Sequence, residues 1–151
     1  MNMSISTNYA RLREEIPKDV TIVLSVKTRT VEQIEEAIDA GVTDIGQNYV
    51  QEAGQMYSAL KKKATKVRWH MIGHLQTNKI NKALRIFDVI QTIDSLEKAA
   101  AIDKRAERAR KEIVPVSMSS VIFHFLKIAP IIRHTALLSS PFPAFPRVLL
   151  T

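Results

Sequence analysis

Residues 20–46 read VTIVLSVKTRTVEQIEEAIDAGVTDIG, and this stretch decides the fold class. It opens at residues 20–26 with a β-rich run that contains no glycine or proline, which predicts a strand. Thr30 and Gln33 have the spacing of a capping box, so a helix is expected to begin there. Gly41 is expected to end this helix in a left-handed conformation. The stretch therefore predicts a strand followed by a helix.

The same alternation continues along the chain. Further strands are predicted at residues 42–46, 67–73, 87–92 and 113–116, and further helices at residues 48–61, 78–84 and 94–111. The last of these helices opens with a second predicted capping box, in which Asp94 is the cap. This order predicts an α/β protein with a parallel sheet. No glycine-rich phosphate loop is present, so about four and a half units of an incomplete, TIM-like (β/α) barrel are favoured over a doubly wound nucleotide fold.

Charge and cysteine content limit the classes of function that the sequence favours. The net charge is +7, but basic residues alternate with acidic ones on predicted helix faces, so nucleic-acid binding is not favoured. A basic cluster lies at residues 61–68, where a solvated helix end is expected. The chain has no cysteine and no apolar segment in residues 1–15 that resembles a signal peptide. A cytoplasmic protein is expected.

The composition changes near residue 116. Residues 117–151 contain no acidic residue and no glycine, but four of the six prolines. Two domains follow: a partial barrel at 1–116 and an apolar, proline-containing tail at 117–151. The tail is interpreted as a frame-shifted or mis-spliced segment, and the alternative is a divergent apolar helix with a loose end. The run 121–132 is interrupted by Lys127 and Pro130, so it is not predicted to span a membrane.

Polar side chains follow the predicted strands, at the end where (β/α) barrels carry their working groups. They are Lys27, Thr28 and Arg29; Gln47, Asn48 and Tyr49; His70, His74 and Gln76; and Gln91, Thr92 and Asp94. Lys27 is the most specific of them, because it follows an apolar strand. Lost hydration there favours the neutral amine that reacts with an aldehyde. The alternative is a surface lysine that happens to end a strand.

His70 and His74 do not predict a metal site. They share a strand face only if the strand continues through Gly73, and no carboxylate lies close in sequence to complete a ligand set. A histidine satisfied in the core, or one that faces a cofactor, is the preferred interpretation of these residues.

Four motifs occur in a fixed order: VTIVLSVKTRTVEQIEEAIDAG, DIGQNYVQEA, WHMIGHLQTNK and FDVIQTIDS. Together they resemble the pyridoxal phosphate homeostasis protein family, over residues 10–116 and about half of a full member. The resemblance implies a fold like the N-terminal barrel of alanine racemase. It also implies the cofactor pyridoxal 5′-phosphate (PLP).

The resemblance also implies site residues. Lys27 matches the lysine that holds PLP as a Schiff base, and Asn48 matches the asparagine of the family's G-E-N-Y motif. His70, Gly73 and His74 match the segment that lines the same mouth. Family members bind, buffer and deliver PLP, so PLP and PLP-dependent apo-enzymes are the implied partners in vitamin B6 homeostasis. No robust turnover of the protein's own is implied.

The chain also departs from the family pattern. Gln47 stands where the family has glutamate, and the later loops that hold the cofactor phosphate are not matched, so impaired PLP binding is expected. Half a barrel is expected to expose two strand edges, which favours self-association. Two other functions stay open. One is a PLP-dependent racemase or lyase that uses Tyr49 or His70 as acid and base. The other is a basic nucleic-acid-binding module.

Overall fold

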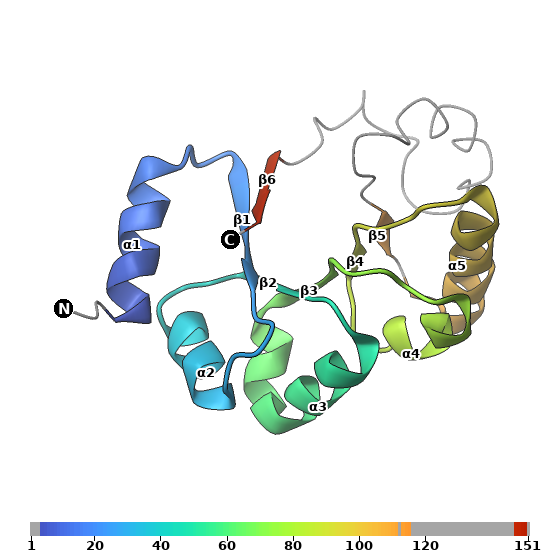
Figure 1. Ribbon diagram of the computed structural model, residues 1–151, viewed down its shortest axis with the longest axis horizontal. Helices are drawn as coiled ribbons and strands as arrows, with labels where there is room; N and C mark the ends of the chain where they lie inside the picture. Colours follow the sequence, from blue (N-terminus) through green and yellow to red (C-terminus); the bar gives the residue numbers. More distant parts are fainter. Residues whose placement is uncertain (1–3, 112, 116–146, 151) are drawn as a thin grey trace.

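Parallel strands and helices alternate in the computed structural model, which describes residues 4–111, 113–115 and 147–150 (Figure 1). The elements are α1 Ile5–Glu15, β1 Val20–Ser25, α2 Val31–Asp39, β2 Asp44–Gln47, α3 Val50–Leu60, η1 Lys61–Lys66, β3 Arg68–Met71, η2 Thr77–Lys79, α4 Ile80–Ala83, β4 Val89–Ile90, α5 Leu96–Ala109, β5 Val114–Pro115 and β6 Arg147–Leu150. The predicted α/β alternation is confirmed, although the strands are shorter than the sequence indicated.

All described strands belong to one parallel sheet with the order β5-β4-β3-β2-β1-β6. Helices α2, α3, α4 and α5 follow one another along one side of this sheet (Figure 1). Right-handed crossovers place helices on a single side when a parallel sheet curls as in a barrel. The structure therefore agrees with the predicted incomplete barrel rather than with a doubly wound sheet.

Helix α2 has both predicted ends. The Thr30 side chain accepts from the Gln33 backbone N–H at 3.3 Å, and the Gln33 side chain accepts from the Thr30 N–H at 3.1 Å. At the other end Gly41 has a φ of 98°, and its N–H donates to the Ile38 carbonyl. The Val42 N–H donates to the Ala37 carbonyl, which completes a Schellman motif. These local bonds fix where the first βα unit turns.

The sheet has two different faces. Its helix-covered face contributes Ile45, Trp69, Met71 and Ile90 to the hydrophobic core. The strand register places Val23, Gly46, His70 and Val89 on the opposite face. In a closed barrel that opposite face is the interior.

Strand β6 was not predicted from the sequence. It pairs in parallel with β1, with Val20 opposite Arg147 and Val23 opposite Leu150. The expectation of two exposed edges is therefore wrong for the β1 edge, because backbone pairing from the tail covers it. The rest of the predicted tail, including the apolar run 121–132, lies outside the described residues.

Two other expectations change in detail. The cap of α5 is Ser95, whose side chain accepts from the Lys98 N–H, and not Asp94. Lys63 in the basic cluster forms ion pairs with Asp39 at 2.9 Å and Glu35 at 3.6 Å, so part of that cluster's charge is neutralised by α2. These pairs lie on the surface, and they give the cluster a structural role that does not require nucleic acid.

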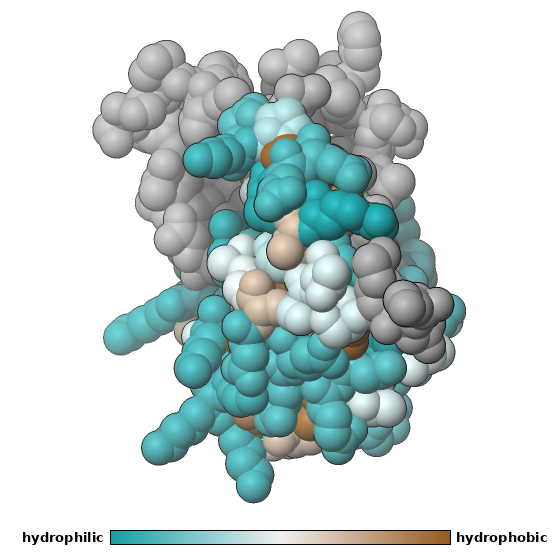
Figure 2. All heavy atoms as spheres, turned by 90° about the vertical axis from the view of Figure 1, so that its left-hand side faces the viewer, coloured by the Kyte–Doolittle hydropathy of each residue, from teal (hydrophilic) through white to brown (hydrophobic). Residues whose placement is uncertain are grey.

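Helix α1 packs beside α2 without burying any of its own residues. Figure 2 faces this side of the molecule and shows mainly hydrophilic side chains. Among the described residues, no helix is long and apolar enough to cross a membrane.

Candidate functional site

A tight turn places Lys27 at the carboxyl end of β1. The Arg29 N–H donates to the Val26 carbonyl at 3.2 Å, and Thr28 has a φ of 63°. Among the residues of this turn only Thr28 has a positive φ, which is the pattern of a type II turn. Glycine or asparagine normally occupies this position, because a β-branched residue is strained there. The turn next to Lys27 therefore stores backbone strain.

Lys27 itself is exposed, although Val26 before it is fully buried. Its Nζ lies 5.9 Å from the centre of the Tyr49 ring, within the range of a cation–π contact. Tyr49 comes from the loop after β2 and is 53% exposed. Ile22 and Val23 in β1 are buried, but the Lys27 side chain is exposed, so the loss of hydration predicted for its amine is not found.

Relief of this strain gives a prediction for Thr28. Thr28→Asn is expected to raise the free energy of unfolding by about 1 kcal/mol, since asparagine tolerates the left-handed region better than a β-branched residue. Urea denaturation followed by Trp69 fluorescence would measure the change. Thr28→Val is the matched control, because it keeps the β-branch and loses the hydroxyl. Equal stability of the two variants would refute strain at this turn.

The loops after β2, β3 and β4 are joined at Gly73. A Cβ built on Gly73 would lie 2.2 Å from the Asn48 carbonyl oxygen and 2.7 Å from the Asn48 Cα. Only glycine fits such a close approach of two backbones. The Thr92 hydroxyl donates to the Gly73 carbonyl from the other side. Asn48, Gly73 and Thr92 therefore form a continuous rim at the carboxyl ends of these strands.

His74 belongs to a surface network on the same rim. Its Nδ1 lies 3.2 Å from the Asp94 carboxylate, and the Lys98 ammonium lies 2.7 Å from both oxygens of Asp94. The hydrogen bond from Lys98 is the main cause that lowers the pKa of Asp94. Lys98 is buried, so this pairing is what allows a cationic group to be placed there.

A buried polar chain crosses the inner face of the sheet beneath this rim. His70 Nε2 lies 2.8 Å from Asp44 Oδ1, and His70 Nδ1 lies 3.0 Å from the Gln91 amide nitrogen. Asp44, His70 and Gln91 are 4%, 3% and 3% exposed, so no solvent competes for these bonds. Since the Gln91 amide nitrogen can only donate, Nδ1 accepts from it, and Nε2 donates to Asp44.

Asp44 is held as a carboxylate by its partners. Burial by itself raises the pKa of Asp44, but hydrogen bonds from His70 and Thr43 and the charge of Arg68 outweigh it, and the pKa is lowered. The Thr43 hydroxyl donates to Asp44 Oδ2 at 2.7 Å, and Arg68 Nε lies 3.7 Å from Oδ1. The chain Asp44–His70–Gln91 thus ties β2, β3 and the end of β4 together.

The residues singled out from the sequence separate into two groups. The structure places Lys27, Asn48, Gly73 and His74 on loops at the carboxyl ends of β1, β2 and β3. It places His70 on the buried inner face, where both ring nitrogens are engaged, as in the interpretation of a core-satisfied histidine.

Sequence reasoning missed Asp44 and its bond to His70. The alternation of side chains along a β-strand could have indicated this bond, because Asp44, His70 and Gln91 fall on inward-facing positions of neighbouring strands. Gln47 and Gln91, expected at the mouth, are buried instead. Gln47 turns back so that its Oε1 accepts from the Asn48 N–H.

A parallel sheet with helices along one side is the arrangement of a (β/α)-barrel protein, and Lys27 lies just past its first strand. The family model of the alanine racemase N-terminal domain matches residues 3–118. The chain belongs to this family.

Relatives within the family share a name. The pyridoxal phosphate homeostasis protein of Synechocystis sp. is 34% identical over 103 residues, which cover 68% of this chain and 47% of the relative. The protein of the same name from Escherichia coli K12 is 34% identical over 110 residues, which cover 66% of this chain and 47% of the relative. The chain thus spans about half the length of these curated relatives.

Solved structures agree with the fold. PipY of Synechococcus elongatus, solved with PLP bound, superposes with a TM-score of 0.71 at 32% identity and covers 74% of this chain and 52% of PipY. An alanine racemase of Clostridium difficile has a TM-score of 0.62 at 13% identity, covering 74% of this chain and 30% of the racemase, and supports the fold alone.

Proposed function

We propose that this chain binds pyridoxal 5′-phosphate at the carboxyl ends of its strands, where Lys27 and the rim of Asn48, Gly73 and Thr92 lie, and that Lys27 holds the cofactor covalently. The observation that carries the proposal is the placement of an accessible lysine amine directly past the first strand of a barrel-type sheet. The similarity to PipY, which was solved with PLP bound, supports it. The bound cofactor would supply a reactive aldehyde and a ring that withdraws electrons.

The residues of the rim fit such a group. The strained turn at Thr28 fixes the backbone that carries Lys27, and the Tyr49 ring lies beside the Lys27 ammonium. The close packing of Gly73 on Asn48 fixes the backbone of the rim next to Lys27. His74 and Asn48 supply polar groups on the loops after β3 and β2. His70 lies beneath the rim and supports it through Asp44 and Gln91.

We further propose that the chain serves in PLP homeostasis as a cofactor carrier without turnover of its own. Of the two residues that the racemase or lyase alternative could use as acid and base, His70 has both ring nitrogens engaged, which leaves Tyr49 as its candidate. PLP-dependent apo-enzymes are the proposed recipients of the cofactor, and a cytoplasmic location accords with a sequence that lacks cysteine. Self-association through the β5 edge of the sheet is proposed as well, because β5 pairs only with β4 among the described strands.

Trapping with borohydride tests the cofactor site. The full chain is incubated with PLP and reduced, and the pyridoxyl group is mapped by mass spectrometry. We expect about one group per chain on Lys27, and loss of that label in Lys27→Ala, because reduction fixes only an amine already bonded to the aldehyde.

Lys18→Ala is the matched control for this experiment. Lys18 is also exposed and lies before β1, at the opposite end of the same strand from Lys27. Its removal is expected to leave the label on Lys27 unchanged. Low labelling spread over many lysines, equal in all three proteins, would contradict the proposed site.

A further inference from the structure

A basic pocket lies between α4 and α5, on the helical side of the sheet and outside the proposed cofactor rim. It has a volume of about 370 Å³. It is lined by Asn81, Leu84, Arg85, Arg105, Arg108 and Ala109. Three arginine residues therefore line one concave space.

The charge of this pocket is not neutralised by the part of the chain that the structure describes. None of the three arginines forms an ion pair there, whereas Lys63, Lys98 and Lys111 each lie near a carboxylate. Arg105 donates to the Thr77 carbonyl at 3.0 Å, which anchors its side chain at the pocket. Asp103 and Glu107 follow α5 at a step of about 100° per residue, so they fall on the side of the helix away from Arg105.

Stabilisation of helix ends accounts for only one of the three arginines. Arginine near a helix C-terminus is favoured by the helix dipole, which acts within the last turn. Arg108 lies in the last turn of α5 and is favoured there, but Arg105 precedes that turn, and Arg85 follows α4, which has only four residues. Like charges gathered around one pocket repel each other unless an anion lies between them.

We propose that this pocket binds the phosphate group of a small molecule, as a phosphomonoester or as inorganic phosphate. Guanidinium forks match the geometry of phosphate oxygens and form paired, charge-assisted hydrogen bonds. The Asn81 amide adds a neutral donor. Leu84, which is buried, and Ala109 form an apolar wall that suits the organic part of a phosphomonoester. This site does not depend on Lys27 or on the proposed cofactor.

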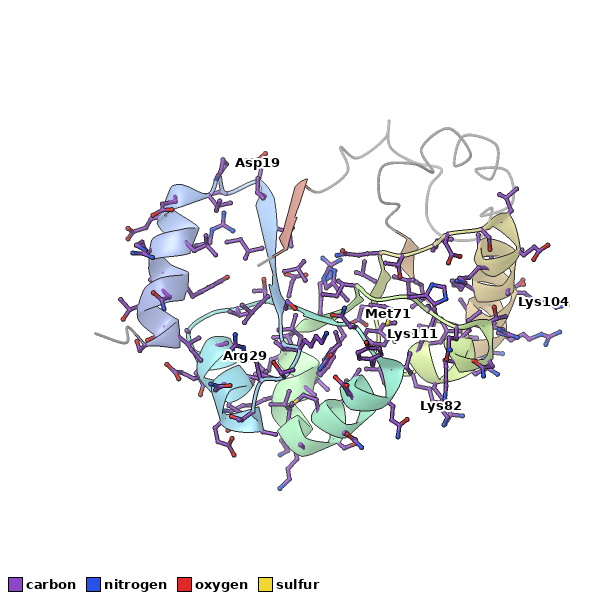
Figure 3. The ribbon with its side chains drawn as sticks, viewed as in Figure 1. Asp19, Arg29, Met71, Lys82, Lys104 and Lys111 are labelled. Atoms are coloured by element: carbon purple, nitrogen blue, oxygen red, sulfur yellow. The ribbon has the colours of Figure 1, made fainter. Side chains whose placement is uncertain are left out.

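Phosphate binding in matched double variants tests the pocket. Inorganic phosphate and phenyl phosphate are titrated into the full chain at constant ionic strength, and dissociation constants are taken from phosphorus NMR line widths. Arg85→Gln/Arg108→Gln is expected to raise the dissociation constant about tenfold or more, since two charge-assisted contacts are lost. Lys82→Gln/Lys104→Gln removes the same charge from α4 and α5 but not from the pocket lining, because both side chains extend outward (Figure 3). It is expected to change the constant by about twofold at most.

Three outcomes would overturn the proposal. Equal weakening in the two double variants would show only a general effect of charge. Tighter binding of a single-stranded oligonucleotide than of phenyl phosphate, with steep salt dependence, would identify a nucleic-acid surface instead. If the arginine double variant does not fold by circular dichroism, Arg108→Lys decides. This variant keeps the positive charge but loses the paired N–H donors of the guanidinium group, so we expect severalfold weaker phosphate binding. An unchanged dissociation constant would reject the site.

Discussion

Replacing His70 with leucine is expected to lower the free energy of unfolding by about 3–5 kcal/mol, because it leaves the Asp44 carboxylate buried without its main partner. His70 is the residue that links Asp44 to Gln91 across the inner face of the sheet. Urea denaturation followed by fluorescence measures the loss directly. Trp69, the single tryptophan, is buried beside His70 on β3 and reports on this strand.

Two variants separate the buried charge from the lost packing. His70→Gln keeps an N–H that can reach Asp44, so its loss of stability is expected to be smaller. Asp44→Val combined with His70→Leu removes the charge and is expected to recover part of the stability, as replacements of buried ion pairs by apolar residues often do. If His70→Leu is as stable as the native chain, the chain Asp44–His70–Gln91 does not hold the sheet together.

The pH dependence of stability follows from the same carboxylate. The pKa of Asp44 is lower in the folded state than in the unfolded state, where it is about 3.9. Its contribution to the free energy of unfolding is therefore fully present above the unfolded-state pKa and is lost as pH falls through the folded-state pKa. In His70→Leu the pKa of Asp44 is expected to rise, because the hydrogen bond from His70 no longer offsets the effect of burial. Acid unfolding of this variant should therefore begin at a higher pH than that of the native chain.

Gly73→Ala is expected to lower the free energy of unfolding by about 1–3 kcal/mol or more, because the new methyl group overlaps the backbone of Asn48. The nearest atoms are backbone atoms, at 2.2 and 2.7 Å, and a side-chain rotation cannot relieve the overlap. The loops after β2 and β3 must separate. We therefore also expect less pyridoxyl label on Lys27 at a fixed PLP concentration.

Gly54→Ala is the matched control for this substitution. Gly54 lies in α3, and the nearest atom to its added Cβ is Ile86 Cδ1 at 3.5 Å, an ordinary contact. Alanine in a helix interior is favoured over glycine by about 0.5–1 kcal/mol, so this variant is expected to be more stable than the native chain. The close contact between Gly73 and Asn48 would be refuted if both alanine variants were equally stable.

Local signals in the sequence predicted the first βα unit well. Thr30, Gln33 and Gly41 act through bonds within a few residues, and all three behave as those signals indicate. The order of strands and helices follows from the same kind of local pattern. Lys27 could be placed at a strand end because the apolar run 20–26 indicated the end of β1 to within one residue.

Features that depend on distant partners were not predicted. Asp94 looks like a helix cap by spacing, but its carboxylate binds Lys98, and the neighbouring Ser95 takes the cap. The positive φ of Thr28 is imposed by a turn that threonine does not favour. The polar chain through His70 needs the sheet register, which no single strand reveals. Strand β6 was missed because its pairing partner lies near the other end of the sequence.

The pairing of β6 with β1 also sets an order of events during synthesis. Ribosomes add about 5–20 residues per second, so β1 emerges on the order of ten seconds before residues 147–150 are made. During that interval the β1 edge has no partner of its own chain, while β2 and α2 can already fold against its other side. Closure across so long a loop also comes late on entropic grounds. Until residues 147–150 are made, the nascent chain therefore carries an unpaired strand edge at β1, and β6 later covers it.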